Sequence, residues 1–236
     1  MTTENTKINP EIEKMMKAGA HLGYTKMRRH PSLKSFILTT KNKTDIIDLE
    51  KTLVSLDKTK EFMKKMAEEK KNIVFVCAKP EGKKSTRAAA EKINMPFVVE
   101  RWIGGTLTNF PEIKKRIDLL IDLKDKRSKG ELDKYTKKER LMFDREIIKL
   151  ELYFGGLVSL KKIPDAIFIV DSKKEDITVK EANQMRIPVI SLANTDSNID
   201  NINYPIVTND SSITSIKFFV DEIAGAYVAP TPVTTA

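Results

Sequence analysis

The stretch CAKPEGKKST, residues 77–86, has residue types that could bind a phosphate between a strand and a helix. A phosphate-binding loop of the Walker type needs a glycine five residues before its Gly-Lys pair and a serine or threonine directly after it. Cys77 and Lys84 stand at those two positions. Backbone amides therefore cannot wrap a phosphate as the motif requires, and the sequence disfavours nucleotide hydrolysis. We interpret the stretch as a basic edge between a strand and a helix, formed by Lys79, Lys83, Lys84 and Arg87.

Polar side chains at the ends of two predicted strands are candidates for ligand binding. Asp171 ends the apolar run IFIVD, and Asn194, Thr195 and Asp196 follow the run IPVISLA. Doubly wound sheets often bind ligands at this edge, which makes a phosphate-ligand or nucleotide-binding enzyme the alternative function. Asp and Asn at strand ends also cap helices and close turns. We favour this structural interpretation, because no histidine or matching general base lies nearby in the sequence.

The histidines and the cysteine form a poor set for metal binding or nucleophilic catalysis. His21, His30 and Cys77 lack the short spacings that are typical of zinc sites. No Ser-His-Asp or Cys-His order occurs at a recognisable turn. We therefore expect no metal, no cofactor and no nucleophilic catalysis by these residues.

Residues 100–110, ERWIGGTLTNF, contain the only tryptophan of the chain and a Gly-Gly pair. The pair lacks the third glycine and the preceding apolar strand of a dinucleotide-binding fingerprint. We predict a structural corner, because paired glycines adopt backbone angles that other residues resist, while Trp102 packs beneath them. We expect Arg101 to point outward and Thr106 and Thr108 to hold the turn.

A core of alternating strands and helices must position these candidate residues. An unbroken apolar run predicts a buried strand at residues 73–77, and further strands are predicted at residues 96–99, 166–170, 187–192 and 204–207. Helical periodicity occurs at residues 48–66, 85–93, 178–185 and 212–224. Strands that alternate with helices indicate βαβ units and a mostly parallel sheet.

The N-terminal region predicts a short helix, a basic loop and a strand. Asn9 and Pro10 have the cap and first-turn proline of a helix start, and Gly19 would end the helix. Residues 21–30 predict an irregular loop, and residues 36–39 predict a strand. Nine residues without an acidic side chain hold the cations that we expect to contact phosphates: Lys26, Arg28, Arg29 and Lys34.

Positive charge is concentrated near the N-terminus. Residues 7–43 hold nine basic and two acidic residues, whereas residues 163–236 hold five basic and ten acidic residues. This asymmetry, within a net charge of +9, suggests a polyanionic partner. A nucleic acid fits better than a membrane, because we expect the cations in loops and not along an apolar amphipathic helix. The alternative is a lysine-rich surface that only keeps the protein soluble.

Residues 112–154 interrupt the alternation of strands and helices. They are rich in charge and carry two narrow apolar stripes, at Ile113, Ile117, Leu120 and Leu123 and at Phe143, Ile147, Leu150 and Phe154. We predict an antiparallel helical hairpin with a coiled-coil seam; two ordinary helices packed on the sheet are the alternative. The α/β body would then be discontinuous, at 8–111 and 155–227, with flexible termini at 1–7 and 228–236.

The stretch RWIGGTLTN resembles a signature of the bacterial small-subunit ribosomal protein 2 family. Further segments follow in that family's order: AGAHLG, NKTDIIDLEKT, FVCAK, TKKE, PDAIFIVD, KEANQMRIPVI and YPIVTND. The resemblance covers about residues 11–227. It implies a flavodoxin-like, three-layer α/β body with a mostly parallel sheet and a protruding antiparallel helical hairpin.

The resemblance also implies a non-catalytic structural protein of the small ribosomal subunit, in the cytoplasm and away from membranes. Its implied partners are small-subunit rRNA, neighbouring ribosomal proteins and ribosomal protein 1, which it helps to dock for mRNA binding. The signature is matched at Arg101, Trp102, Gly104, Gly105, Thr108 and Asn109. We predict RNA contacts for Lys26, Arg28, Arg29, Lys34, Lys83, Lys84, Arg87, Arg101 and Asn109. The sequence departs from the family pattern at Tyr24, which replaces a common histidine, at Asn194, Thr195 and Asp196, and at Thr214 and Ser215.

Overall fold

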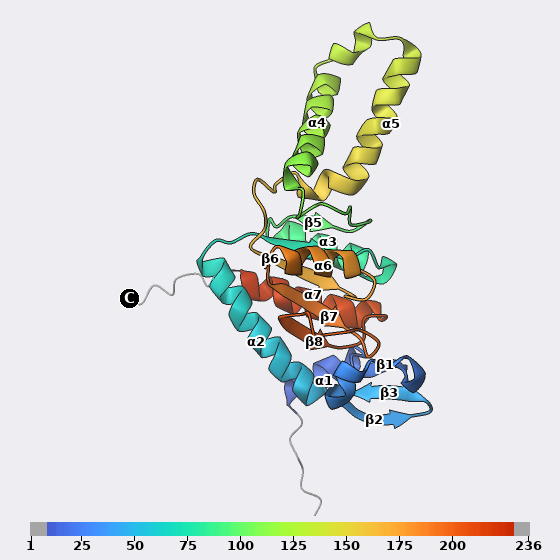
Figure 1. Ribbon diagram of the computed structural model, residues 1–236, viewed down its shortest axis with the longest axis vertical. Coiled ribbons are helices and arrows are strands. Elements are labelled where there is room, and N and C mark those ends of the chain that lie inside the picture. The colour runs from blue at the N-terminus through green and yellow to red at the C-terminus, as the bar shows by residue number, and fades with distance from the viewer. Residues whose placement is uncertain (1–8, 229–236) are drawn as a thin grey trace, which may run out of the picture.

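The computed structural model describes residues 9–228, which form an α/β body with a projection at each end (Figure 1). One projection is a helical hairpin, and the other is a small antiparallel sheet at the opposite end of the molecule. The termini predicted to be flexible, residues 1–7 and 228–236, lie outside the described residues except for Val228.

The body is built on five parallel strands in the order β5-β4-β6-β7-β8. Their bounds are β4 (Ile73–Val76), β5 (Phe97–Val98), β6 (Ala166–Val170), β7 (Val189–Ala193) and β8 (Tyr204–Val207). Counted along the chain, this is the order 2-1-3-4-5 of flavodoxin-like sheets. Every residue of β4, β6 and β7 is buried, as expected for strands covered on both faces. The predicted fold class is therefore confirmed.

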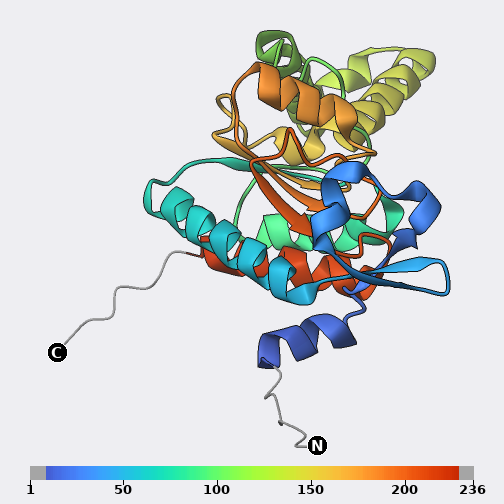
Figure 2. The ribbon, with the colours of Figure 1, turned by 60° about the horizontal axis from the view of Figure 1, so that its bottom comes forward.

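Helices cover both faces of the sheet, which Figure 2 shows between its two layers. The first layer contains α1 (Pro10–Lys17), α2 (Leu49–Glu68), α3 (Pro80–Lys92) and α7 (Ile213–Tyr227), and the second contains α6 (Asp176–Gln184). Side chains alternate between two cores, because successive residues of a strand face opposite sides. Phe75 and Phe168 belong to the core under α2, α3 and α7, whereas Val74 and Ile167 belong to the core under α6.

The hairpin consists of α4 (Phe110–Ser128) and α5 (Lys137–Phe154), joined through a short 3-10 helix, Glu131–Lys134. Thr136 and Glu139 form a capping box that starts α5. The predicted apolar stripes form the seam, and ion pairs between Lys124 and Glu151 and between Arg127 and Asp144 cross it. The base of the hairpin packs in the same core as α6, so it also covers the sheet.

The Gly-Gly pair lies in a turn before α4, and a residue that the sequence did not reveal holds this corner. Gly105 has a φ of +91°, and Trp102 is buried. The carboxylate of Glu181 on α6 accepts hydrogen bonds from the backbone N–H of Gly105 at 2.7 Å and of Leu107 at 3.0 Å. The Thr106 hydroxyl donates to the Ile103 carbonyl at 2.6 Å, whereas Thr108 is exposed.

Two predicted boundaries were wrong. Residues 21–30 are not an irregular loop, because they contain β1 (Leu22–Thr25) and a 3-10 turn, Lys26–Arg28. β1 pairs with β3 (Thr44–Ile47), which also pairs with β2 (Ile37–Lys41). This pairing is not local, so periodicity within β1 does not reveal it. Helix α3 begins at Pro80, five residues before the predicted start, with that proline in its first turn.

Removing the outer part of the hairpin should leave the body folded. We expect that a protein with residues 116–146 replaced by a short Gly/Ser linker unfolds in one cooperative thermal transition, measured by circular dichroism. The reason is that the base of the hairpin, including Phe110, Ile113 and Phe154, remains to cover the sheet. A broad, non-cooperative transition would show that the outer hairpin belongs to the main fold.

The corner predicts different costs for its two glycines. Gly105→Ala should lower the free energy of unfolding by about 1 to 3 kcal/mol, because a side chain strains a backbone with positive φ. Gly104 has no positive φ, and an added Cβ would lie 3.8 Å from Glu181 Oε1, so Gly104→Ala should stay within about 0.5 kcal/mol. Urea unfolding measures both. Equal effects at the two positions would contradict the proposed strain at Gly105.

Candidate nucleic-acid interface

The projection beside β8 carries the densest unbalanced positive charge. We call residues 22–47, with strands β1, β2 and β3, the basic module. It contains one acidic residue, Asp45, and the six cations Lys26, Arg28, Arg29, Lys34, Lys41 and Lys43. Only Arg29 forms an ion pair with any of the described residues. The other five cations are exposed and leave a net positive charge on the module, which lies at the end of the molecule opposite the hairpin (Figure 1).

Arg29 has a structural role inside the module. Its Nε donates to Asp45 Oδ2 at 2.8 Å, and its Nη2 donates to Asp45 Oδ1 and to the Thr40 hydroxyl. The hydrogen bond from Arg29 holds the pKa of Asp45 below its ordinary value, although burial opposes this shift. Arg29, one of the four cations that we expected to contact phosphates, is therefore neutralised by an acid outside residues 26–34. Asp45 lies eleven residues beyond that stretch, on β3, and the pairing of β3 with β1 brings it near Arg29.

Arg28 lies beside an aromatic ring on the surface of the module. Its guanidinium carbon is 4.8 Å from the ring centre of Tyr24, within the range of a cation–π contact. Met27, between them in the sequence, is 97% exposed. Lys26 and Lys34 are also exposed. This surface therefore combines free cations with a Tyr-Arg cation–π pair and an apolar side chain.

Thr195, at the carboxyl end of β7, attaches the basic module to the body. The backbone N–H of His30 donates to the Thr195 carbonyl at 2.8 Å, and that of Tyr24 donates to the Thr195 hydroxyl at 2.9 Å. A Cβ on Gly23 would lie 2.6 Å from Thr195 Cγ2, so the close approach requires glycine there. His30 Nδ1 is 2.8 Å from the Ser32 hydroxyl and 3.3 Å from its backbone nitrogen.

Lys79 is the centre of a buried polar cluster at the carboxyl edge of the sheet. Its Nζ lies 3.0 Å from Asp171 Oδ2 and 3.0 Å from Asp210 Oδ2. Asn194 Nδ2 donates to Asp210 Oδ1 at 2.8 Å. Lys79 is only 9% exposed, so the interpretation of this lysine as part of an open basic edge was wrong. Glu175, also buried, accepts the N–H of Ala78 at 3.1 Å.

The cluster fills the edge of the sheet that α/β enzymes commonly use for ligands. Burial alone would lower the pKa of Lys79, but the carboxylates of Asp210 and Asp171 outweigh it and raise that pKa. The lysine therefore stays charged and paired at neutral pH. Burial also raises the pKa of the Cys77 thiol to about 11, which leaves little thiolate for a nucleophilic role. Asp196, the other candidate at this edge, pairs with Lys173 at 2.9 Å.

The remaining residues predicted to bind RNA lie at the opposite end of the sheet, around β5 and α3. Lys83 pairs with Glu100, and Arg87 pairs with Glu91 at 2.8 Å. Both charges are therefore balanced within the chain. Lys84, Arg101 and Asn109 are exposed, and Asn109 precedes α4 without capping it through its side chain. The structure thus separates the predicted residues into two groups and does not bring them together.

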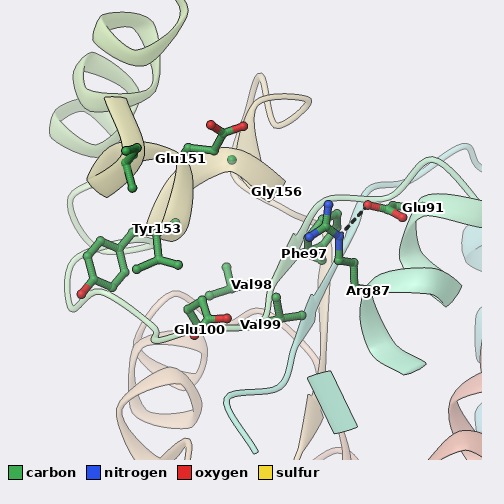
Figure 3. Close-up of a pocket in the computed structure, with 12 residues that line it drawn as sticks. Arg87, Glu91, Phe97, Val98, Val99, Glu100, Glu151, Tyr153 and Gly156 are labelled. Carbon is green, nitrogen blue, oxygen red and sulfur yellow. Dashed lines mark hydrogen bonds and ion pairs between the residues drawn. The ribbon is translucent and has the colours of Figure 1, made fainter. Parts of the chain in front are cut away.

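A groove of about 500 Å³ lies between α5 and the edge strand β5 (Figure 3). Apolar side chains from both elements line it, including Phe97, Val99 and Ile148. Its one lining cation, Arg87, faces Glu91. The groove therefore offers no free positive charge to a nucleic acid. Among residues 9–228, no helix is long and apolar enough to cross a membrane.

Comparison with known proteins identifies the family. The chain matches the family described as Ribosomal protein S2 over residues 15–229. The small ribosomal subunit protein uS2 of Dictyoglomus turgidum is 40% identical over 91% of this chain and 87% of its own length. The uS2 protein of Petrotoga mobilis is 41% identical, over 92% of this chain and 75% of the relative. That of Roseiflexus castenholzii is 38% identical, over 96% and 86%.

These matches confirm the resemblance carried by RWIGGTLTN and the segments around it. They cover the α/β body, the basic module and the helical hairpin together. The chain therefore belongs to the ribosomal protein S2 family, whose members are structural constituents of the small ribosomal subunit.

Proposed function

We propose that the protein binds small-subunit rRNA through the basic module and thereby holds its α/β body in place on the small ribosomal subunit. The charge of the module carries this proposal. Five exposed cations have no acidic partner among the described residues, and Asp45, the one acid of the module, is buried against Arg29. Lys and Arg side chains neutralise RNA phosphates and position a protein without reading the base sequence.

The hairpin would extend the contacts of the protein to RNA or to neighbouring ribosomal proteins. It projects from the end of the body opposite the basic module, so the two projections can reach separate partners (Figure 1). Docking of ribosomal protein 1 is a further proposal that rests on the family resemblance. As a part of the ribosome, the protein would work in the cytoplasm.

We propose no catalytic role. The edge of the sheet that would serve a nucleotide-binding enzyme is occupied by the Lys79 ammonium and its two carboxylates. A phosphate entering there would have to break these ion pairs and would meet the negative charges of Asp171 and Asp210. Separating a buried ion pair costs several kcal/mol, which disfavours the alternative of a phosphate-ligand enzyme.

The salt dependence of RNA binding tests the role of the basic module. We expect that the double substitution Lys26→Ala and Lys34→Ala lowers the slope of log affinity against log salt by about 0.7 to 0.9 for each phosphate that the protein no longer neutralises. Both side chains are exposed, so the melting temperature should not change. Affinity for small-subunit rRNA, measured across a salt series, gives the slope. Arg29 is left intact, because its removal would leave the buried carboxylate of Asp45 without its positive partner.

The matched control removes the same number of positive charges from a surface outside the basic module. Lys64 and Lys65 are exposed, unpaired among residues 9–228, and lie in the C-terminal half of α2, away from the module. Their double substitution by alanine should leave the slope within error of the unmodified protein. An unchanged slope in the Lys26 and Lys34 variant, or an equal change in both variants, would remove the basic module from the RNA interface.

A further inference from the structure

We propose that Tyr24 and Arg28 form a stacking site for one unpaired RNA base. The inference rests on the proposed RNA-binding function. It states which part of the RNA the basic module would bind: a single-stranded or bulged nucleotide, in addition to the phosphates of a duplex. Neither residue is explained by the core, since Tyr24 is half-buried and Arg28 is exposed.

Hydrogen bonds from the body fix the tyrosine in place. Its backbone N–H donates to the Thr195 hydroxyl at 2.9 Å, and its phenolic oxygen is hydrogen-bonded with the Ser211 hydroxyl at 2.8 Å. Thr195 and Ser211 follow two different strands of the sheet, β7 and β8. Because both ends of the residue are held, stacking on this side chain would order little additional structure.

The guanidinium of Arg28 is available to a ligand. It lies 4.8 Å from the centre of the Tyr24 ring, and it has no ion pair with the described residues. Its nearest acidic neighbour within the module, Asp45, is already bound by Arg29. A planar guanidinium placed on an aromatic ring can accept a nucleobase on its other face, as in many single-strand RNA sites.

The surroundings favour a base over a phosphate alone. Met27 next to the pair is 97% exposed, and its apolar side chain gains most by covering the apolar face of a base. Lys26 and Lys34 are exposed in the same module and can bind the phosphates on either side of the base. Base pairs within an intact duplex cannot stack on the side chains, so the site would select unpaired nucleotides.

Arg28→Lys separates stacking from charge, because lysine keeps the positive charge and loses the planar group. The full chain is titrated with a short single-stranded RNA that carries 2-aminopurine at its centre, and with the same strand in a duplex. We expect the variant to bind the single strand about 5- to 100-fold more weakly, with less change in 2-aminopurine fluorescence. Duplex affinity and the salt slope should be unchanged. Tyr24→Leu should act in the same direction.

Arg186→Lys is the matched control. Arg186 is exposed and precedes the amino end of β7, whereas the basic module is attached beyond the carboxyl end of that strand. The substitution Arg186→Lys should leave the affinity for both RNAs unchanged. If the unmodified protein binds both RNAs and Arg28→Lys binds them equally well, the stacking site is overturned but the proposed function stands. If the unmodified protein binds neither RNA, both are overturned. Unchanged RNA binding with weaker incorporation into small subunits would assign the pair to a protein partner and also overturn the stacking site.

Discussion

The buried ammonium group of Lys79 organises the edge of the sheet on which the functional surface depends. Lys79 follows β4, Asp171 follows β6 and Asp210 follows β8, so two ion pairs join the ends of three strands. Asn194, after β7, joins the cluster through Asp210. Burying these charges is costly in itself, and the cost is offset only because each charge has its partners within hydrogen-bonding distance. The result is a fixed set of strand ends in a place where related folds keep an open site.

Hydrogen bonds connect this cluster to the basic module. Asp210 accepts hydrogen bonds from Asn194 and from the Ser211 hydroxyl, Asn194 accepts from the Thr195 backbone, and Thr195 binds the chain at Tyr24 and His30. The module is therefore connected to the buried ion pairs through short polar contacts. A rigid position suits a surface that works by electrostatic and stacking contacts, since it lets several cations meet a structured RNA together. The hairpin, by contrast, is tied to the body only at its base.

The sequence predicted the architecture better than the chemistry of single residues. Buried parallel strands are continuous apolar runs, so β4 and β6 were found close to their observed bounds. The apolar stripes at 4 and 3 residue spacing likewise identified the hairpin. Three features depended on contacts between distant segments and had no local signal. These were the pairing of β1 with β3, the neutralisation of Arg29 by Asp45, and the support of the Gly105 corner by Glu181. Lys79 was misplaced for the same reason, because its carboxylate partners, Asp171 and Asp210, lie 92 and 131 residues further along the chain.

Sedimentation of the native protein tests the central claim most directly, namely that a closed α/β body acts by its place in the small ribosomal subunit. A cell lysate is separated on a sucrose gradient at low salt, and the protein is followed by immunoblot alongside small-subunit rRNA. We predict that it co-migrates with small subunits and shifts to the top of the gradient as salt weakens its binding to phosphates. Protein that stays at the top of the gradient at low salt, and that binds nucleotides when purified, would contradict the account.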